Sequence, residues 1–194
     1  MSRAYFTLTP APAAVGDPVA KVGGQPNWLA EPQWPLSRDL GTPMWFIGQF
    51  AVEGGLAYVF LSEATEAIDY AAEPDGGENA VIIQPYGRLP LLQRSYLEIP
   101  SPVAVVTQAQ GPTVGPDHLL IEVTLGQAGQ GALQFLGDEP QWLQGDELPE
   151  AGYRLIAQLD SQRLPFDVDF GDAGIGYVFI SSDGREGRFL WQCH

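Results

Sequence analysis

Apolar residues along this chain either alternate with polar ones or form short runs, and few follow a helical period. In the segment 118–125, for example, aliphatic residues at every second position alternate with polar residues such as Glu122 and Thr124. Gly- and Pro-rich turns separate these runs, as is typical of short β-strands. The pattern predicts strands at 3–9, 45–50, 56–61, 80–84, 103–107, 118–125, 153–159, 175–180 and 189–192. We therefore expect a mainly β fold with little helix, and the pattern leaves open whether it is a barrel or a sandwich.

Three local features refine this picture. The run 58–61 is apolar at every position, which favours a strand covered on both faces. Glu53-Gly54-Gly55 is a hairpin turn candidate between two predicted strands. The segment 62–72 is a short helix candidate, with Ser62 as its N-cap and alanines in its body.

Three sequence blocks occur twice in the same order. Residues 23–29 are echoed by 137–143, residues 44–50 by 153–159, and residues 55–62 by 174–181. The offsets are 114, 109 and 119 residues, so the blocks persist while the loops between them differ. Two copies are too few for a solenoid. We expect one domain over residues 1–194, with similar halves at about 21–90 and 135–194 packed about a pseudo-twofold axis and a connecting β segment at about 91–134.

Composition excludes some function classes. The chain has 194 residues, 45% of them hydrophobic, which is enough to bury a core. Its 24 acidic and nine basic residues give a net charge of −15. No cluster of Lys and Arg is present to neutralise phosphates, so we expect no nucleic-acid partner. The acidity serves either solubility or attraction to a basic protein partner.

The chain contains one cysteine, Cys193, so no intrachain disulfide is expected. Its first residues lack the apolar run of a signal peptide, and no stretch approaches the roughly 18 apolar residues that span a bilayer. We expect a cytoplasmic protein without a membrane partner.

Several short motifs resemble those of the YwqG-like family, a bacterial domain family of unassigned function. The motifs are Gly23-Gly24-x-Pro26, Pro32-x-Trp34-Pro35, Phe46-Ile47-x-Gln49, Gly137-x-x-Pro140-x-Trp142, Gly171-Asp172-Ala173-Gly174, Tyr177-Val178-Phe179-Ile180 and Trp191-Gln192-Cys193. They lie in the segments 21–62 and 135–194, about half of the chain. The resemblance implies a mainly β, internally duplicated fold and supplies no catalytic residues.

Four aspartates, at positions 160, 167, 169 and 172, fall within thirteen residues. Paired carboxylates can act as acid and base or bind a hard cation, but the order here is not that of an EF-hand loop. Asp beside Gly is also common in turns. Asp167 and Asp172 are therefore binding candidates, with turn formation as the alternative.

No metal or cofactor is expected. Cys193 and His194 are neighbours whose side chains would point to opposite faces of a strand. His118 has no spaced partner, and zinc needs three or four ligands. The Gly-rich stretches lack the ending of a phosphate loop, and no nucleophile elbow is present.

Gln49 and Gln158 each interrupt an apolar strand at the same position of their repeat. A buried amide must find hydrogen-bond partners, and here it can hold a neighbouring loop. Alternatively, the two glutamines line a groove between the halves together with Trp28 and Trp142. The tryptophans can equally cover the ends of the core.

Two classes of function follow. The first is an acidic, non-catalytic binding protein, for instance an immunity-like partner of a basic effector. The second is a small-ligand binder or hydrolase with a carboxylate-lined cleft between the halves. Carbohydrate stacking on exposed Trp34 or Trp45 is a further possibility.

Overall fold

The computed structural model describes residues 4–11, 17–63, 71–86, 103–115, 119–124, 133–137 and 139–194. Regular structure in these residues is nearly all β, as the sequence predicts. The strands are β1 (Ala4–Pro10), β2 (Lys21–Val22), β3 (Trp34–Pro35), β4 (Trp45–Val52), β5 (Gly55–Leu61), β6 (Asn79–Pro85), β7 (Val105–Val106), β8 (Leu119–Thr124), β9 (Phe135–Leu136), β10 (Tyr153–Asp160), β11 (Ile175–Ser181) and β12 (Gly187–Gln192). A three-residue 3-10 helix, η2 (Ser161–Arg163), follows β10.

Most predicted strands are confirmed to within two residues at either end. The strand expected at 103–107 is shorter and comprises only β7. The two-residue strands β2, β3 and β9 were missed, because two residues cannot display an alternating pattern. The predicted helix at 62–72 falls largely on residues 64–70, which lie outside the described residues. No helix in the described part of the chain is both long and apolar enough to cross a membrane.

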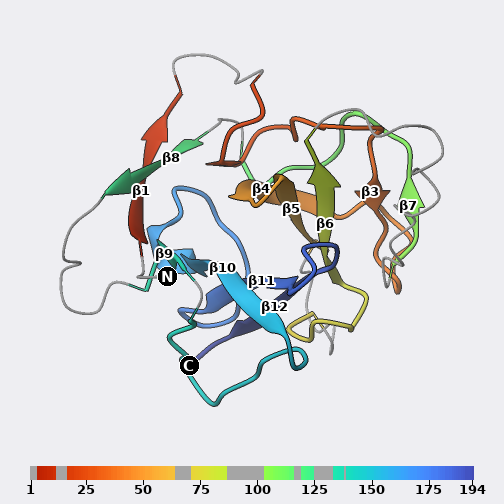
Figure 1. Ribbon diagram of the computed structural model, residues 1–194. Coiled ribbons are helices and arrows are strands. Elements are labelled where there is room, and N and C mark those ends of the chain that lie inside the picture. Colours follow the sequence, from red (N-terminus) through yellow and green to blue (C-terminus); the bar gives the residue numbers. More distant parts are fainter. Residues whose placement is uncertain are drawn as a thin grey trace.

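Ten strands form one antiparallel sheet with the order β12-β11-β10-β9-β1-β8-β2-β4-β5-β6. Its end strands β6 and β12 are not hydrogen-bonded neighbours, yet they pack together. A Cβ atom placed on Gly187 of β12 would lie 2.3 Å from the Val81 side chain on β6. The sheet therefore curls into a nearly closed barrel (Figure 1). Strands β3 and β7 form a separate two-stranded sheet on the outer side of β6 (Figure 1).

Apolar side chains occupy both faces of this sheet. An inner cluster combines residues from the whole chain, including Val59 and Val178. Two outer clusters lie on the other face, one around Tyr58 and the other around Tyr177. Because successive residues of a strand point to opposite faces, β5 contributes to the inner and the first outer cluster in turn. The prediction that residues 58–61 are covered on both faces is confirmed.

Strands β4 and β10 share an irregularity that positions the polar residues described below. The register of β4 with β5 shifts between Phe46 and Gly48, and that of β10 with β11 shifts between Leu155 and Ala157. Such a β-bulge re-aims the residues that follow it. In the strand pairing, Gln49 then lies opposite Tyr58 and Gln158 lies opposite Tyr177.

Candidate functional site

Gln49 and Gln158 are fully buried and each holds a loop. The side-chain oxygen of Gln49 accepts a hydrogen bond from the backbone N–H of Asn27 at 2.9 Å, and its amide donates to the Val19 carbonyl at 2.7 Å. Gln158 accepts from the backbone N–H of Gln141 at 2.9 Å and donates to the carbonyl of the same residue at 3.3 Å. Both side-chain amides thus find their hydrogen-bond partners in neighbouring loops, as the first of the two interpretations of these residues predicts.

Two buried tyrosines bind the same two loops. The Tyr58 hydroxyl accepts from the Leu29 backbone N–H at 3.0 Å, and the Tyr177 hydroxyl accepts from Leu143 at the same distance. Burial disfavours the phenolate, so it raises the pKa of both side chains, that of Tyr177 to about 12. These hydroxyls therefore stay protonated and can donate to loop carbonyls as well.

A second pair of glutamines, Gln84 on β6 and Gln192 on β12, completes each arrangement. In each loop, two successive backbone N–H groups donate to one side-chain oxygen at 3.0 Å: those of Leu29 and Ala30 to Gln84, and those of Leu143 and Gln144 to Gln192. The sequence predicted no role for these two glutamines. The signal that drew attention to Gln49, an amide within an apolar strand, applies to them equally.

Trp28 and Trp142 cover the outer clusters. Their rings lie 4.8 Å from the rings of Tyr58 and Tyr177, respectively. The Trp28 indole N–H also donates to the Ala109 carbonyl at 3.2 Å. Neither tryptophan, and neither Gln49 nor Gln158, lines the cavities described here and below. A ligand-binding role for these four residues stays a prediction.

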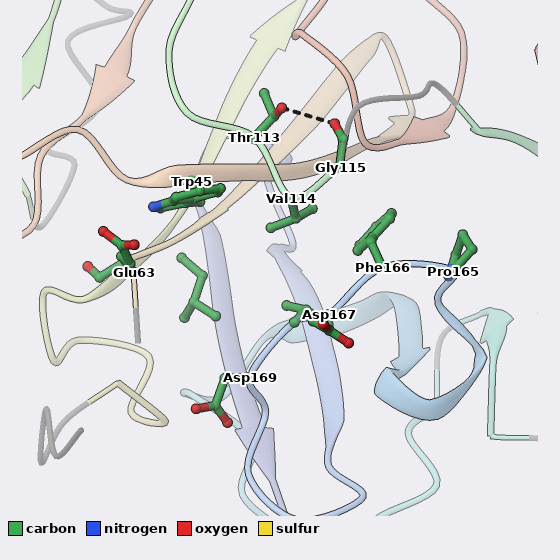
Figure 2. A pocket seen from close by; sticks show the side chains of 12 residues that line it. Trp45, Glu63, Thr113, Val114, Gly115, Pro165, Phe166, Asp167 and Asp169 are labelled. Atoms are coloured by element: carbon green, nitrogen blue, oxygen red, sulfur yellow. Dashed lines mark hydrogen bonds between the residues drawn. The ribbon is translucent and has the colours of Figure 1, made fainter. Parts of the chain in front are cut away.

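A cavity of about 830 Å³ lies between segments from distant parts of the chain (Figure 2). It is lined by residues 45, 61–63, 113–115 and 165–169. Trp45 and Glu63 lie on one side of it and Phe166 on the other, with Asp167 between them in this view (Figure 2). Leu61, Val114 and Val168 add to its apolar wall, which makes the cavity mainly apolar with carboxylates at its edge.

The hydroxyl groups that line this cavity are engaged in local hydrogen bonds. Ser62 donates to the buried carboxylate of Glu78 at 2.6 Å, and Thr113 donates to the Gly115 carbonyl at 3.2 Å. Among the carboxylates, Asp169 accepts from the backbone N–H of Gly171 at 2.8 Å. The exposed carboxylates Glu63 and Asp167 are the polar groups best placed to meet a ligand.

The four clustered aspartates do not share one site. Asp167 and Asp169 line the cavity, whereas Asp160 accepts from the Gln162 backbone N–H and pairs with Arg163 at 3.2 Å. Asp172 lies outside the cavity lining, and its carbonyl accepts from the His194 N–H. Within the described ranges, no group of three or more His, Cys, Asp or Glu side chains could hold a metal ion. His118 lies outside those ranges.

Sequence reasoning did not identify Phe166 and Glu63 as cavity residues, because nothing in the local pattern links positions so far apart. The prediction of an exposed Trp34 is wrong: its side chain is fully buried and its indole N–H donates to the Met44 carbonyl at 2.7 Å. Trp45, by contrast, is half-buried and lines the cavity.

Comparison with known proteins adds no relative to this picture: no protein-family model matches the chain, and no curated protein does.

Proposed function

We propose that this chain is a non-catalytic binding protein whose 830 Å³ cavity receives a cationic side chain of a basic protein partner. One observation carries the proposal. Three carboxylates, those of Glu63, Asp167 and Asp169, edge an apolar cavity in whose described lining no Lys, Arg or His is found. An Arg or Lys side chain has the matching form, with an apolar stem and a charged end.

The aromatic lining favours the same occupant. A guanidinium group stacks favourably on Trp or Phe, and Trp45 and Phe166 both line the cavity. The net charge of −15 would also attract a basic partner over a distance and speed its association. Immunity-like inhibition of a basic effector is one biological role consistent with this chemistry.

A hydrolase that uses the same carboxylates is the second candidate, and Asp167 is then its principal polar group. The described lining supports the binding role better. It offers no His or Cys, and its Ser62 and Thr113 hydroxyls already donate to other groups.

The test is titration of the intrinsic tryptophan fluorescence, to which Trp45 contributes, with an arginine-rich peptide at low salt. We expect saturable binding that weakens with ionic strength, and Asp167→Asn should weaken it about threefold, as for loss of one exposed charge pair. Asp172→Asn is the matched control, because Asp172 lies outside the lining and should leave affinity unchanged. Equal effects of both variants, or no saturable binding, contradict the proposal. Free arginine amide, run in parallel, shows whether a small organic cation suffices in place of a peptide.

We also infer that the chain arose by duplication, with halves related by an approximate twofold axis between β1 and β8. Any antiparallel pair has a local twofold axis, and the register shows where that axis falls between β1 and β8. Tyr5 pairs with Thr124 and Thr9 with Leu120, on either side of the central pair Thr7 and Glu122. A twofold rotation about that central pair would exchange the two outer pairs.

The sheet order supports the duplication and adds β1 to the first repeated unit and β8 to the second. β1, β2, β4, β5 and β6 correspond in order to β8, β9, β10, β11 and β12. β8 pairs with β2, and β1 pairs with β9. The first strand of each five-strand unit therefore pairs with the second strand of the other unit. The motifs of this chain resemble those of the YwqG-like family, and this resemblance implies such a duplication. We therefore include membership of that family in this proposal.

A further inference from the structure

A second cavity, of about 500 Å³, lies beside β12. Its wall includes Leu148, Pro149, Leu190 and Trp191, and Asp75 and Glu147 lie at its edge. Leu148 is 54% exposed, although it lines the cavity together with the apolar residues Leu190 and Trp191. The corresponding place in the first half of the chain has a different structure.

The corresponding place in the first half is filled. Counting from the loop residues Leu29 and Leu143, Trp34 corresponds to Leu148, and counting from Gln84 and Gln192, Ile82 corresponds to Leu190. Trp34 is fully buried and belongs to the same apolar cluster as Ile82. The larger indole thus takes up the space that stays open beside Leu148.

A strand also covers Trp34. In the two-stranded sheet, Trp34 and Pro35 of β3 pair with Val106 and Val105 of β7, and the Leu36 backbone N–H donates to the Ala104 carbonyl at 2.8 Å. Among the residues that the structure describes, none pairs in this way with the segment at Leu148 and Pro149. Within the described ranges, the Leu148 backbone makes no hydrogen bond. Its backbone N–H and carbonyl groups and its apolar side chain are therefore available to an incoming strand.

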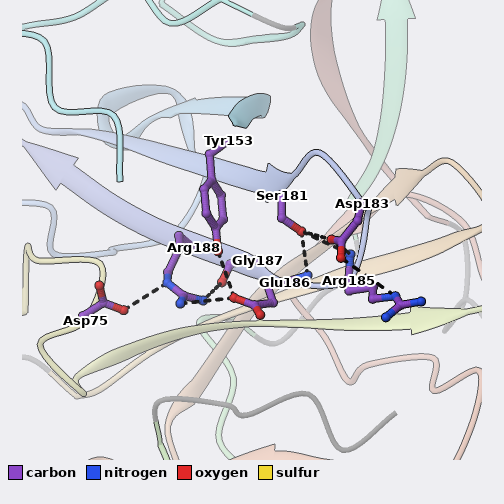
Figure 3. A network of polar contacts seen from close by, with 8 residues as sticks. All are labelled: Asp75, Tyr153, Ser181, Asp183, Arg185, Glu186, Gly187 and Arg188. Atoms are coloured by element: carbon purple, nitrogen blue, oxygen red, sulfur yellow. Dashed lines mark hydrogen bonds and ion pairs between the residues drawn. The ribbon is translucent and has the colours of Figure 1, made fainter. Parts of the chain in front are cut away.

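The charge around this groove is negative. Asp146, Glu147 and Glu150 are exposed on the segment that carries Leu148, and no Lys or Arg lines the described part of the cavity. Arg188 lies nearby, but it pairs with Asp75 at 3.0 Å and with Glu186 at 3.4 Å (Figure 3). Its charge is thus already engaged. Charge complementarity favours a segment that carries basic residues.

We propose that the groove between Leu148 and Leu190 binds an extended segment of a basic partner protein, which pairs with the Leu148 backbone and inserts a large apolar side chain, as β7 and Trp34 do in the first half. This site is separate from the 830 Å³ cavity, and its test does not depend on Asp167. Specificity comes from the apolar side chain in the cavity, and the flanking Lys or Arg residues add affinity at low salt.

The probe is the synthetic peptide acetyl-Arg-Val-Ala-Val-Trp-Arg-amide, which follows residues 103–106 with Trp in place of Val106 and adds two flanking arginines. Binding is measured by NMR on the full chain labelled with nitrogen-15. We expect saturable shifts at Leu148 and at the side-chain amide of Gln192. The same peptide with Glu in place of Arg should bind at least tenfold more weakly.

Leu148→Trp is the decisive variant, because its indole should fill the cavity as Trp34 does and weaken peptide binding at least tenfold. Leu40→Trp is the matched control: Leu40 is 46% exposed in the first half, so this change should leave affinity unchanged. Should Leu148→Trp not fold, Glu150→Gln takes its place, with an expected loss of about threefold for the arginine-flanked probe and none for a glycine-flanked one.

Four outcomes would overturn the proposal. They are the absence of saturable shifts, shifts that map to Trp45 and Asp167, equal affinity in Leu148→Trp and the wild type, and binding of N-acetyltryptophan amide as tight as that of the peptide. A fifth outcome would also overturn it: if the chain forms concentration-dependent dimers that Leu148→Trp abolishes, the groove binds a second copy of this chain and not a basic partner.

Discussion

Lys21, the one lysine of the sequence, is fully buried on β2. Its ammonium group donates to the Gln25 carbonyl and lies 5.9 Å from the centre of the Phe46 ring. Burial disfavours the charged form, so it lowers the pKa of Lys21 from 10.5 to about 8. An ionisable group of this kind makes stability depend on pH.

Between about pH 8 and pH 10, the unfolded chain keeps the Lys21 proton that the folded chain releases. The free energy of unfolding should therefore rise with pH in this range, by at most about 1.4 kcal/mol per pH unit. Above about pH 10 it should fall, because burial raises the pKa of Tyr177 to about 12 and the unfolded tyrosine ionises first. Urea unfolding of the wild type and Lys21→Met at several pH values checks this. A rise of equal size in both proteins contradicts it.

Single residues also show how far the sequence can be interpreted. Gln49 and Gln158 attracted attention because each is a lone amide in an apolar strand, and both prove to be buried and hydrogen-bonded. Trp34 was misjudged because it lies among prolines, where no periodic pattern indicates which face is buried. Its burial depends on Val106 and on Met44, which are distant or irregularly spaced in the sequence.

At the scale of elements, the packing of β6 against β12 decides whether the barrel nearly closes. Gly187 lies where a Cβ atom would come within 2.3 Å of Val81, so only glycine fits without a shift of the strands. Arg188 adds a polar link across this junction through its ion pair with Asp75 (Figure 3). The guanidinium group also lies over the Tyr153 ring, 5.6 Å from its centre.

We predict that Gly187→Ala lowers the free energy of unfolding by about 2 kcal/mol, the usual range for a crowded core substitution. The matched control is Gly145→Ala, where an added Cβ would have no neighbour within 4 Å. Chemical denaturation of both variants measures the difference. Equal stability of the two variants would show that β6 and β12 do not pack as described.

The longer strands were predictable, since alternation is a local property of the sequence. Their order was not. Strand β1 lies between β8 and β9, more than a hundred residues away along the chain, and no local pattern specifies such neighbours. For the same reason the sequence predicted only a carboxylate-lined cleft with Asp167 and Asp172 as candidates, and it did not indicate that Phe166 and Glu63 lie beside Asp167 in the larger cavity.

At the scale of the whole molecule, two similar arrangements surround one apolar interior. In each, a glutamine, a tyrosine and a second glutamine from three neighbouring strands bind one loop. In the described residues, the two arrangements differ in what covers them: β7 and Trp34 cover the first, whereas a cavity lies beside Leu148 at the second. We propose that a basic partner binds at the two cavities, both of which have carboxylates in their described lining.

Amide hydrogen exchange tests the paired arrangement most directly. In the wild type, the N–H groups of Asn27 and Gln141 should both be protected. Gln49→Ala should expose only the first and Gln158→Ala only the second, each lowering the free energy of unfolding by about 2 kcal/mol because a buried donor loses its acceptor. The exposed Gln162→Ala should change neither. Protection of one loop without the other, or exchange unaffected by both substitutions, would contradict the account.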